Sequence, residues 1–232
     1  MSISTKYGRT YHFDFSLGTT SDDRINSNWS KDIQKFETAV HTEKMDGENT
    51  CLSPLGVFAR SHAAPTVHSW ADHLKIRHSM MVNDLKDNNL EIFGENLYAI
   101  HSIIYPRLEA HFYVFGIRVH DMWLSWEETK WYASFFDMPV APELLIQPTS
   151  DTDLIKKTVL DLSKQESVFG SQQNGTSPLV DCTREGIVTR NINEDAVEAF
   201  AKNVFKFVRA DHVQTDVHWS SKITRAKLVH EY

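Results

Sequence analysis

The stretch from residue 41 to residue 50 reads HTEKMDGENT and follows KFETAV at residues 35–40. KFETAV alternates between two faces, a period of two that favours a β-strand over a helix. Asp46-Gly47 then indicates a turn, because glycine lets the backbone approach a ligand closely. We therefore expect Lys44 to lie where a strand ends at a tight turn. Such a lysine is either a solvated hairpin end or a site of chemistry.

The composition is that of a globular protein, with 41% hydrophobic and 24% charged residues among 232. That length suits one large domain, and no low-complexity linker divides it. The chain lacks an N-terminal apolar segment and any stretch long enough to span a bilayer, so we expect an intracellular protein. We expect no disulfide between Cys51 and Cys182 in that compartment.

The net charge is −7, so the surface as a whole does not attract a polyanion. We expect any polyanion partner to bind a local basic surface. Residues 201–232 carry a net positive charge instead, with six Lys and Arg against three Asp and Glu.

Strand-like and helix-like segments follow one another without regular alternation, which predicts an α+β fold with largely antiparallel sheets. Ser125 and Glu128 form a capping-box pattern that opens one helix. The other expected helices cover residues 68–87, 151–165 and 193–205. Strand character marks residues 56–61, 90–100, 111–121, 185–191 and 205–213.

Six short motifs are spread along the chain in a fixed order. They are KMDG at 44–47, ARSH at 59–62, FGEN at 93–96, FYVFG at 112–116, EGIV at 185–188 and VFKFVR at 204–209. Each alone would be read as a turn, a surface charge or a core aromatic. In this order they resemble the motifs of covalent nucleotidyltransferases, which comprise DNA ligases, RNA ligases and RNA capping enzymes. The resemblance is closest to the nick-sealing branch of the ATP-dependent RNA ligase family.

This resemblance implies an adenylyltransferase (ATP-grasp-like) fold, with two mainly antiparallel sheets flanked by helices around an ATP cleft. It also implies that Lys44 attacks ATP to form lysyl-AMP, that AMP passes to a 5′-phosphate, and that a 3′-hydroxyl then displaces AMP. A lysine attacks only when deprotonated, and its ordinary pKa is about 10.4. We therefore expect burial, Arg60, Lys206 and a bound divalent metal to lower the pKa of Lys44.

The remaining roles follow the family pattern residue by residue. Glu95 matches the carboxylate that accepts from the ribose, and Phe115 the aromatic that stacks on adenine. Glu185 matches the carboxylate associated with catalysis and with Mg²⁺ or Mn²⁺, which favour oxygen ligands. Lys206 matches the lysine that reaches the α-phosphate. Arg60 matches the arginine that follows the nucleophile strand.

The sequence departs from the family pattern at three places. Gly116 stands where many relatives carry Asp, which predicts the loss of one polar or metal-linked contact. The last motif has Arg209 in place of a second lysine, and we expect Arg209 to contact substrate. The chain ends at Tyr232, so we expect residues 1–232 to form a single domain without a separate OB-fold domain.

The predicted function is ATP-dependent joining of RNA ends at a nicked duplex or a single-stranded break. Two further partners stay open: a DNA strand in a hybrid duplex, and a protein that binds the RNA ends. One alternative is a DNA-joining or 5′-end-adenylylating enzyme. Another is a catalytically weak nucleic-acid-binding repair subunit. In HVQTDVHW at 212–219, His212, Asp216 and His218 could bind a metal, although a phosphate-contacting loop is the preferred interpretation.

Overall fold

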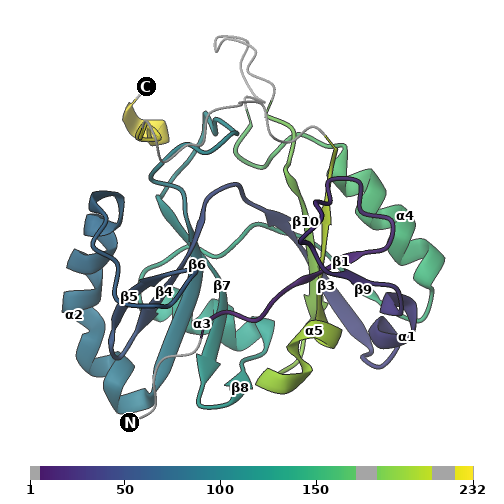
Figure 1. The fold of residues 1–232 in the computed structure, drawn as a ribbon, viewed down its shortest axis with the longest axis horizontal. Coiled ribbons are helices and arrows are strands. Elements are labelled where there is room, and N and C mark those ends of the chain that lie inside the picture. Colours follow the sequence, from purple (N-terminus) through teal and green to yellow (C-terminus); the bar gives the residue numbers. More distant parts are fainter. Residues whose placement is uncertain (1–5, 171–181, 211–222, 232) are drawn as a thin grey trace.

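The computed structural model describes residues 6–170, 182–210 and 223–231, and two six-stranded sheets dominate them (Figure 1). Sheet A has the order β2-β1-β12-β10-β3-β9. Its pairs are antiparallel except that β1 lies parallel to both β2 and β12. Its strands are β1 (Tyr11–Phe13), β2 (Ile25–Asn26), β3 (Thr38–Lys44), β9 (Glu143–Pro148), β10 (Gly186–Asn191) and β12 (Val204–Val208).

Sheet B has the order β11-β8-β7-β6-β4-β5, and all of its pairs are antiparallel. Its strands are β4 (Glu48–Ser53), β5 (Gly56–Ala59), β6 (Leu90–Asn96), β7 (Phe112–Val119), β8 (Met122–Trp123) and β11 (Asp195–Ala196). The α+β prediction with two mainly antiparallel sheets is therefore confirmed.

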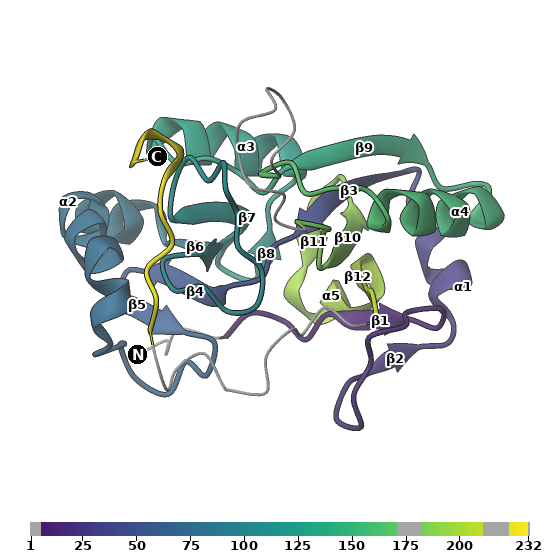
Figure 2. The same ribbon diagram turned by 90° about the horizontal axis from the view of Figure 1, so that it is seen from above.

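Helices cover the outer face of each sheet, and three apolar clusters hold the layers together (Figure 2). On sheet A, α1 (Trp29–Ile33) and α4 (Thr152–Ser163) bury Ile33, Ile155 and Val159 against Phe205 and Phe207. On sheet B, α2 (Asp72–Asn88) and α3 (Trp126–Phe135) supply the covering side chains, among them Leu74, Met81, Leu85 and Ala133. The third cluster fills the space between the sheets.

The capping box predicted for Ser125 is present, because its side chain accepts from the Glu128 amide while Glu128 accepts from the Ser125 amide. The single helix predicted over residues 193–205 is wrong. Asp195 and Ala196 instead pair with β8, a 3-10 turn follows at Val197–Ala199, and α5 covers only Phe200–Asn203. Strand pairing at both ends of this segment overrides its local helical preference.

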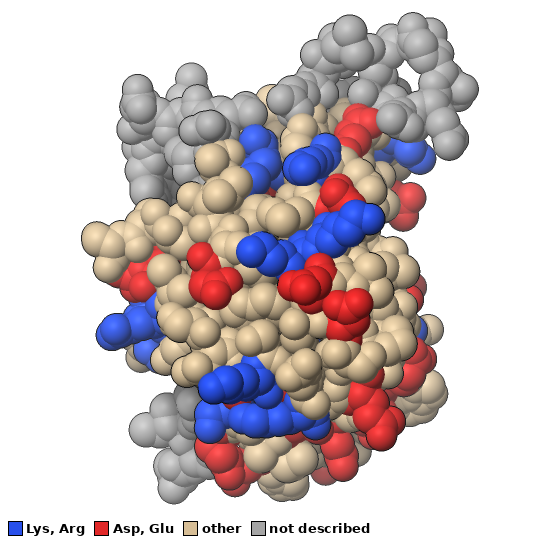
Figure 3. Space-filling view, turned by 90° about the vertical axis from the view of Figure 1, so that its right-hand side faces the viewer, with Lys and Arg blue, Asp and Glu red and all other residues tan. Residues whose placement is uncertain are grey.

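Among the described residues, no helix has the length and apolar character needed to cross a membrane. On the face of the molecule seen in Figure 3, Lys and Arg side chains alternate with Asp and Glu.

Candidate functional site

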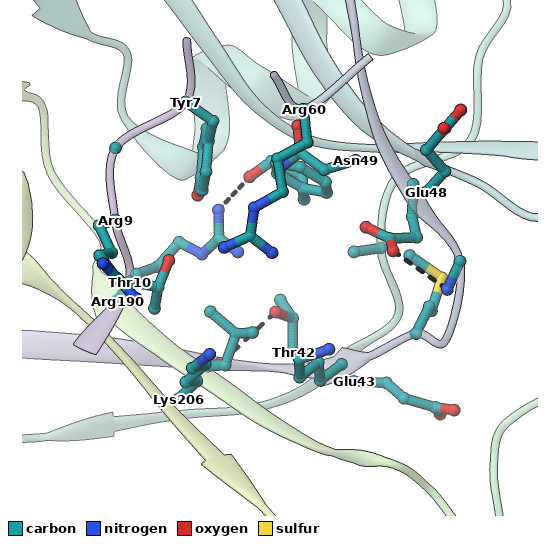
Figure 4. A pocket seen from close by; sticks show the side chains of 18 of the residues that line it. Tyr7, Arg9, Thr10, Thr42, Glu43, Glu48, Asn49, Arg60, Arg190 and Lys206 are labelled. Carbon is teal, nitrogen blue, oxygen red and sulfur yellow. Dashed lines mark hydrogen bonds between the residues drawn. The ribbon is translucent and has the colours of Figure 1, made fainter. Parts of the chain in front are cut away.

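The KMDG turn links the two sheets, since β3 ends at Lys44 in sheet A and β4 begins at Glu48 in sheet B. A cleft of about 780 Å³ opens beside this link. It is lined by side chains from both sheets and by the segment 6–10, which runs along its edge (Figure 4). Five residues predicted from sequence line the cleft: Lys44, Arg60, Glu95, Phe115 and Lys206.

Lys44 forms an ion pair with Glu185, which precedes β10, the neighbouring strand. Its Nζ donates to both carboxylate oxygens, at 2.7 and 2.6 Å. The Lys44 side chain is 25% exposed and that of Glu185 only 8%, so water screens the pair weakly. Burial opposes the charge on Lys44, but the nearby carboxylates of Glu185 and Glu95 outweigh it and raise the pKa of Lys44. The predicted lowering of that pKa is wrong for this arrangement, because the nearest charges are carboxylates.

Glu95 lies across the turn from Lys44, and its Oε1 accepts a hydrogen bond of 3.1 Å from the Gly47 amide. Burial raises the pKa of Glu95 to about 8; Lys44 opposes the shift, while Glu185 and Asp46 add to it. At pH 7 its carboxyl therefore carries a proton in most molecules. A sugar hydroxyl would meet a group that can donate as well as accept. The predicted ribose contact stays a prediction.

Asp46 closes the turn by binding a segment more than fifty residues further along the chain. Its Oδ2 accepts from the amides of Ser102 and Ile103, at 2.7 and 2.8 Å. The Asp46 amide in turn donates to the Tyr105 hydroxyl at 2.9 Å. Sequence reasoning found only a turn here, since the partners of Asp46 carry no motif.

We expect Asp46→Ala to lower the free energy of unfolding by about 2–4 kcal/mol, because it leaves two partly buried backbone amides without their acceptor. Urea unfolding followed by circular dichroism measures this loss. Asp87→Ala, at an exposed position in α2, serves as the control and should change stability little. A loss below about 1 kcal/mol in Asp46→Ala would show that water replaces the carboxylate, contrary to a clamping role.

Lys206 faces the cleft from β12, where its neighbours across the sheet are His12 and Val188. Its Nζ donates to Asp23 Oδ1 at 3.2 Å, and His12 Nε2 lies 3.0 Å from the same oxygen. Burial and the charge of Lys44 lower the pKa of Lys206, although Asp23 opposes the shift. Asp23 belongs to the SLGTTSDD segment, to which sequence analysis assigned no role. In the structure it holds the Lys206 side chain.

Phe115 reaches the cleft through an irregularity in β7. Val114 pairs with Gly94 and Gly116 with Phe93, so Phe115 is the extra residue of a bulge, and bulges re-aim side chains. The Tyr7 ring contacts it edge-on, with ring centroids 5.0 Å apart.

Two further residues support this part of the cleft. Arg190, whose guanidinium binds the Phe115 carbonyl, and Tyr7 were both missed by sequence analysis (Figure 4). A Cβ at Gly116 would lie 3.6 Å from Trp123 and 3.8 Å from Tyr7, so aromatic rings occupy the space beside it.

Arg60 follows β5 as an exposed residue and points into the cleft, with Lys206 on the opposite side (Figure 4). Arg209 is not among the residues that line the cleft. Its Nε donates to the Arg184 carbonyl at 2.8 Å, and its amide donates to the Glu185 carbonyl at 3.1 Å. Arg209 thus holds the backbone that carries Glu185, and its contact with substrate stays a prediction. His212, Asp216 and His218 lie outside the described residues.

The family model described as RNA ligase matches residues 37–208 of this chain, a range that contains every motif given above except the end of the last one at Arg209. The chain belongs to the RNA ligase family. This membership confirms the resemblance found in the sequence. No curated protein matches this RNA ligase family member.

Solved structures of RNA ligases share the fold of this family member. An archaeal ATP-dependent RNA ligase aligns with a TM-score of 0.54 at 16% identity, over 88% of this chain and 48% of that one. A mutant RNA ligase from Naegleria gruberi, solved with ATP and Mn, aligns with a TM-score of 0.58 at 16% identity, over 90% of this chain and 57% of that one. The chain therefore spans about half the length of these two structures.

Proposed function

We propose that the protein is an ATP-dependent RNA ligase that joins 3′-hydroxyl and 5′-phosphate ends. One observation carries the proposal: the end of β3 places Lys44 in the cleft between the sheets, beside Glu185 and Glu95 and with Lys206 on the same sheet. Membership of the RNA ligase family supports it. We further propose that both sheets act as one adenylyltransferase domain, which the apolar cluster shared by the two sheets supports.

In the first step, Lys44 releases its ammonium proton to solvent, and its neutral Nζ attacks the α-phosphorus of ATP. An N–P bond forms, the bond to the bridging oxygen breaks, and pyrophosphate leaves. AMP then passes to the 5′-phosphate of an RNA end, which regenerates the amine of Lys44. The 3′-hydroxyl of the other end attacks this activated phosphate, and AMP leaves. Activation is required because a phosphate monoester oxygen is a poor leaving group.

The cleft residues divide this work by their chemistry. Phe115 and Tyr7 offer aromatic surface to the base, and Glu95 lies where a sugar hydroxyl can bind. Lys206 and Arg60 place positive charge on opposite sides of the cleft for phosphates. Arg209, which binds the backbone next to Glu185, is proposed to meet the RNA end only at the cleft margin.

The carboxylate of Glu185 suits Mg²⁺ or Mn²⁺, since both ions favour hard oxygen ligands. The N. gruberi structure was solved with ATP and Mn, which supports the same requirement here. When bound, such an ion would supply positive charge beside the α-phosphate and Glu185. Glu185, which would hold the ion, would then stabilise the ammonium form of Lys44 less strongly.

The wild-type protein is expected to gain the mass of one AMP when incubated with ATP and Mg²⁺ or Mn²⁺. Intact-mass spectrometry measures the gain, and peptide mapping near neutral or basic pH, where the N–P bond survives, should place it on Lys44. Protein already adenylylated during expression is first discharged with pyrophosphate. A folded, discharged protein that forms no adduct would overturn the proposal in favour of a nucleic-acid-binding repair subunit.

The substrate is then tested by joining assays on nicked duplexes and single-stranded breaks, built from RNA, DNA or a hybrid of both. We expect sealing of RNA ends. An adduct without RNA sealing, but with accumulation of 5′-adenylylated ends, would indicate the adenylylating or DNA-joining alternative, or the need for an end-binding partner.

A further inference from the structure

Cys51, His62 and Glu91 converge on the inner face of sheet B, away from the nucleophile. One donor atom from each lies within 4.8 Å of the other two. Within residues 6–170, 182–210 and 223–231, this is the one such group of three His, Cys, Asp or Glu side chains. Thiolate, imidazole and carboxylate are the three ligand types that Zn²⁺ takes in proteins.

Neighbouring elements of sheet B bring the three side chains together. Cys51 in β4 pairs with Phe58 in β5 and with Phe93 in β6. Glu91 lies two residues before Phe93 and thus on the same face of β6. Cys51 is buried, whereas His62 and Glu91 are partly exposed, so an ion can enter from that side.

His62 is held in an uncommon backbone conformation, with φ at +53°. Its amide donates to the Ala59 carbonyl at 2.9 Å. Its ring stacks on Phe58, with centroids 4.7 Å apart and planes within 8° of parallel. The turn after β5 thus directs the His62 imidazole towards the Cys51 thiol and the Glu91 carboxyl. A glycine at this position would avoid the backbone strain.

Glu91 is oriented by Arg118 on the next strand. Arg118 Nε donates to Glu91 Oε2 at 2.7 Å, and the guanidinium lies 5.0 Å from the centroid of the Phe93 ring. Metal-binding carboxylates are commonly held in this way by a second hydrogen-bonding group. A Cys51 thiolate and Glu91 bring two negative charges to a divalent ion, and Arg118, which stays paired with the carboxylate, adds one positive charge beside them.

We propose that Cys51, His62 and Glu91 form a binding site for a divalent cation of the zinc class, with water as the fourth ligand. Binding deprotonates the Cys51 thiol, forms a metal–sulfur bond and releases one proton to solvent. The ion joins β4, β6 and the turn after β5. It fixes that turn two residues beyond Arg60, which points into the cleft.

Cobalt(II) tests the site directly, because a thiolate bound to cobalt gives a charge-transfer absorption that carboxylate ligands do not give. Full-length protein is stripped with a chelator, dialysed and titrated with Co²⁺ in excess Mg²⁺, which occupies oxygen-rich sites. We expect the absorption to saturate at one Co²⁺ per chain and to disappear when Zn²⁺ is added. Zinc should also raise the thermal unfolding midpoint.

Variants assign the ligands. Cys51→Ser should abolish the absorption, whereas Cys182→Ser, the matched change at the other cysteine, should retain it. His62→Asn tolerates the left-handed backbone, and Glu91→Gln keeps an acceptor for Arg118. Each should weaken Co²⁺ binding at least about tenfold. Circular dichroism of the metal-stripped variants confirms folding, and these two variants carry the test if Cys51→Ser does not fold.

Three results would overturn the site. The first is folded wild-type protein that gives no absorption with Co²⁺. The second is an absorption that Cys182→Ser abolishes and Cys51→Ser retains. The third is an unchanged Co²⁺ affinity in both His62→Asn and Glu91→Gln, which would show that the absorption comes from an isolated thiol. None of these readouts depends on ligase activity.

Discussion

Replacing Lys44 with arginine is expected to abolish the AMP adduct while the protein stays folded. The guanidinium remains protonated at any pH at which the protein is folded, so it has no lone pair with which to attack phosphorus. It can still donate to Glu185 and thus preserve the ion pair between β3 and the start of β10. We expect the rate of adduct formation to fall by at least about 10⁴-fold, as when other enzymes lose a covalent nucleophile.

Transfer of label from α-³²P-ATP, followed by intact-mass spectrometry, measures the adduct in both proteins. Lys86→Arg, at an exposed position near the end of α2, is the matched control and should react like the wild type. An adduct on any lysine of Lys44→Arg, at more than a trace of the wild-type amount, would show that another residue is the nucleophile.

The fold class could be predicted because its signals are local, whereas the cleft residues were predicted from six motifs whose order resembles that of a known family. Alternation before Lys44 and the Asp46-Gly47 turn mark the end of β3 without any tertiary information. Segment 193–205 could not be read in this way, since its helical composition yields to the pairing of β11 with β8 and to the start of β12 at Val204. A strand of two residues such as β11 is too short to leave a periodic pattern.

The contacts that set the chemistry were beyond sequence reasoning because their partners are distant along the chain. Asp23 and Lys206 are separated by 183 positions, and Lys44 and Glu185 by 141. Sequence reasoning identified Lys44 and Glu185 as functional residues, but it did not show the short distance between their charged groups. At 2.6 Å the carboxylate dominates, so the pKa of Lys44 moves upward instead of downward.

Glu185→Gln should separate two effects that the wild-type residue combines. Removing the negative charge beside Lys44 leaves burial, which favours the neutral amine, less opposed. The pKa of Lys44 should therefore fall, because the adjacent opposite charge is lost. Adenylylation by ATP should nevertheless slow by about 10²-fold or more, because a neutral amide is a poorer ligand for the divalent ion than a carboxylate.

Competitive labelling of the protein with acetic anhydride across pH, read by mass spectrometry at the Lys44 peptide, measures the first effect. Only the neutral amine reacts, so the half-reaction pH should move downward in Glu185→Gln. Glu127→Gln, at an exposed glutamate in the first turn of α3, should leave both the labelling curve and the adenylylation rate unchanged.

General unfolding would also move Lys44 from its raised pKa down towards its ordinary pKa and remove activity, so circular dichroism must first show that Glu185→Gln is folded. Glu185→Gln protein that labels like the wild type would show that the ion pair does not keep Lys44 protonated. A variant that labels at lower pH and also adenylylates faster would show that Glu185 only restrains the nucleophile. In that case the metal must be held elsewhere, and Glu43, Glu48 and Glu95 are carboxyl groups among the residues that line the cleft.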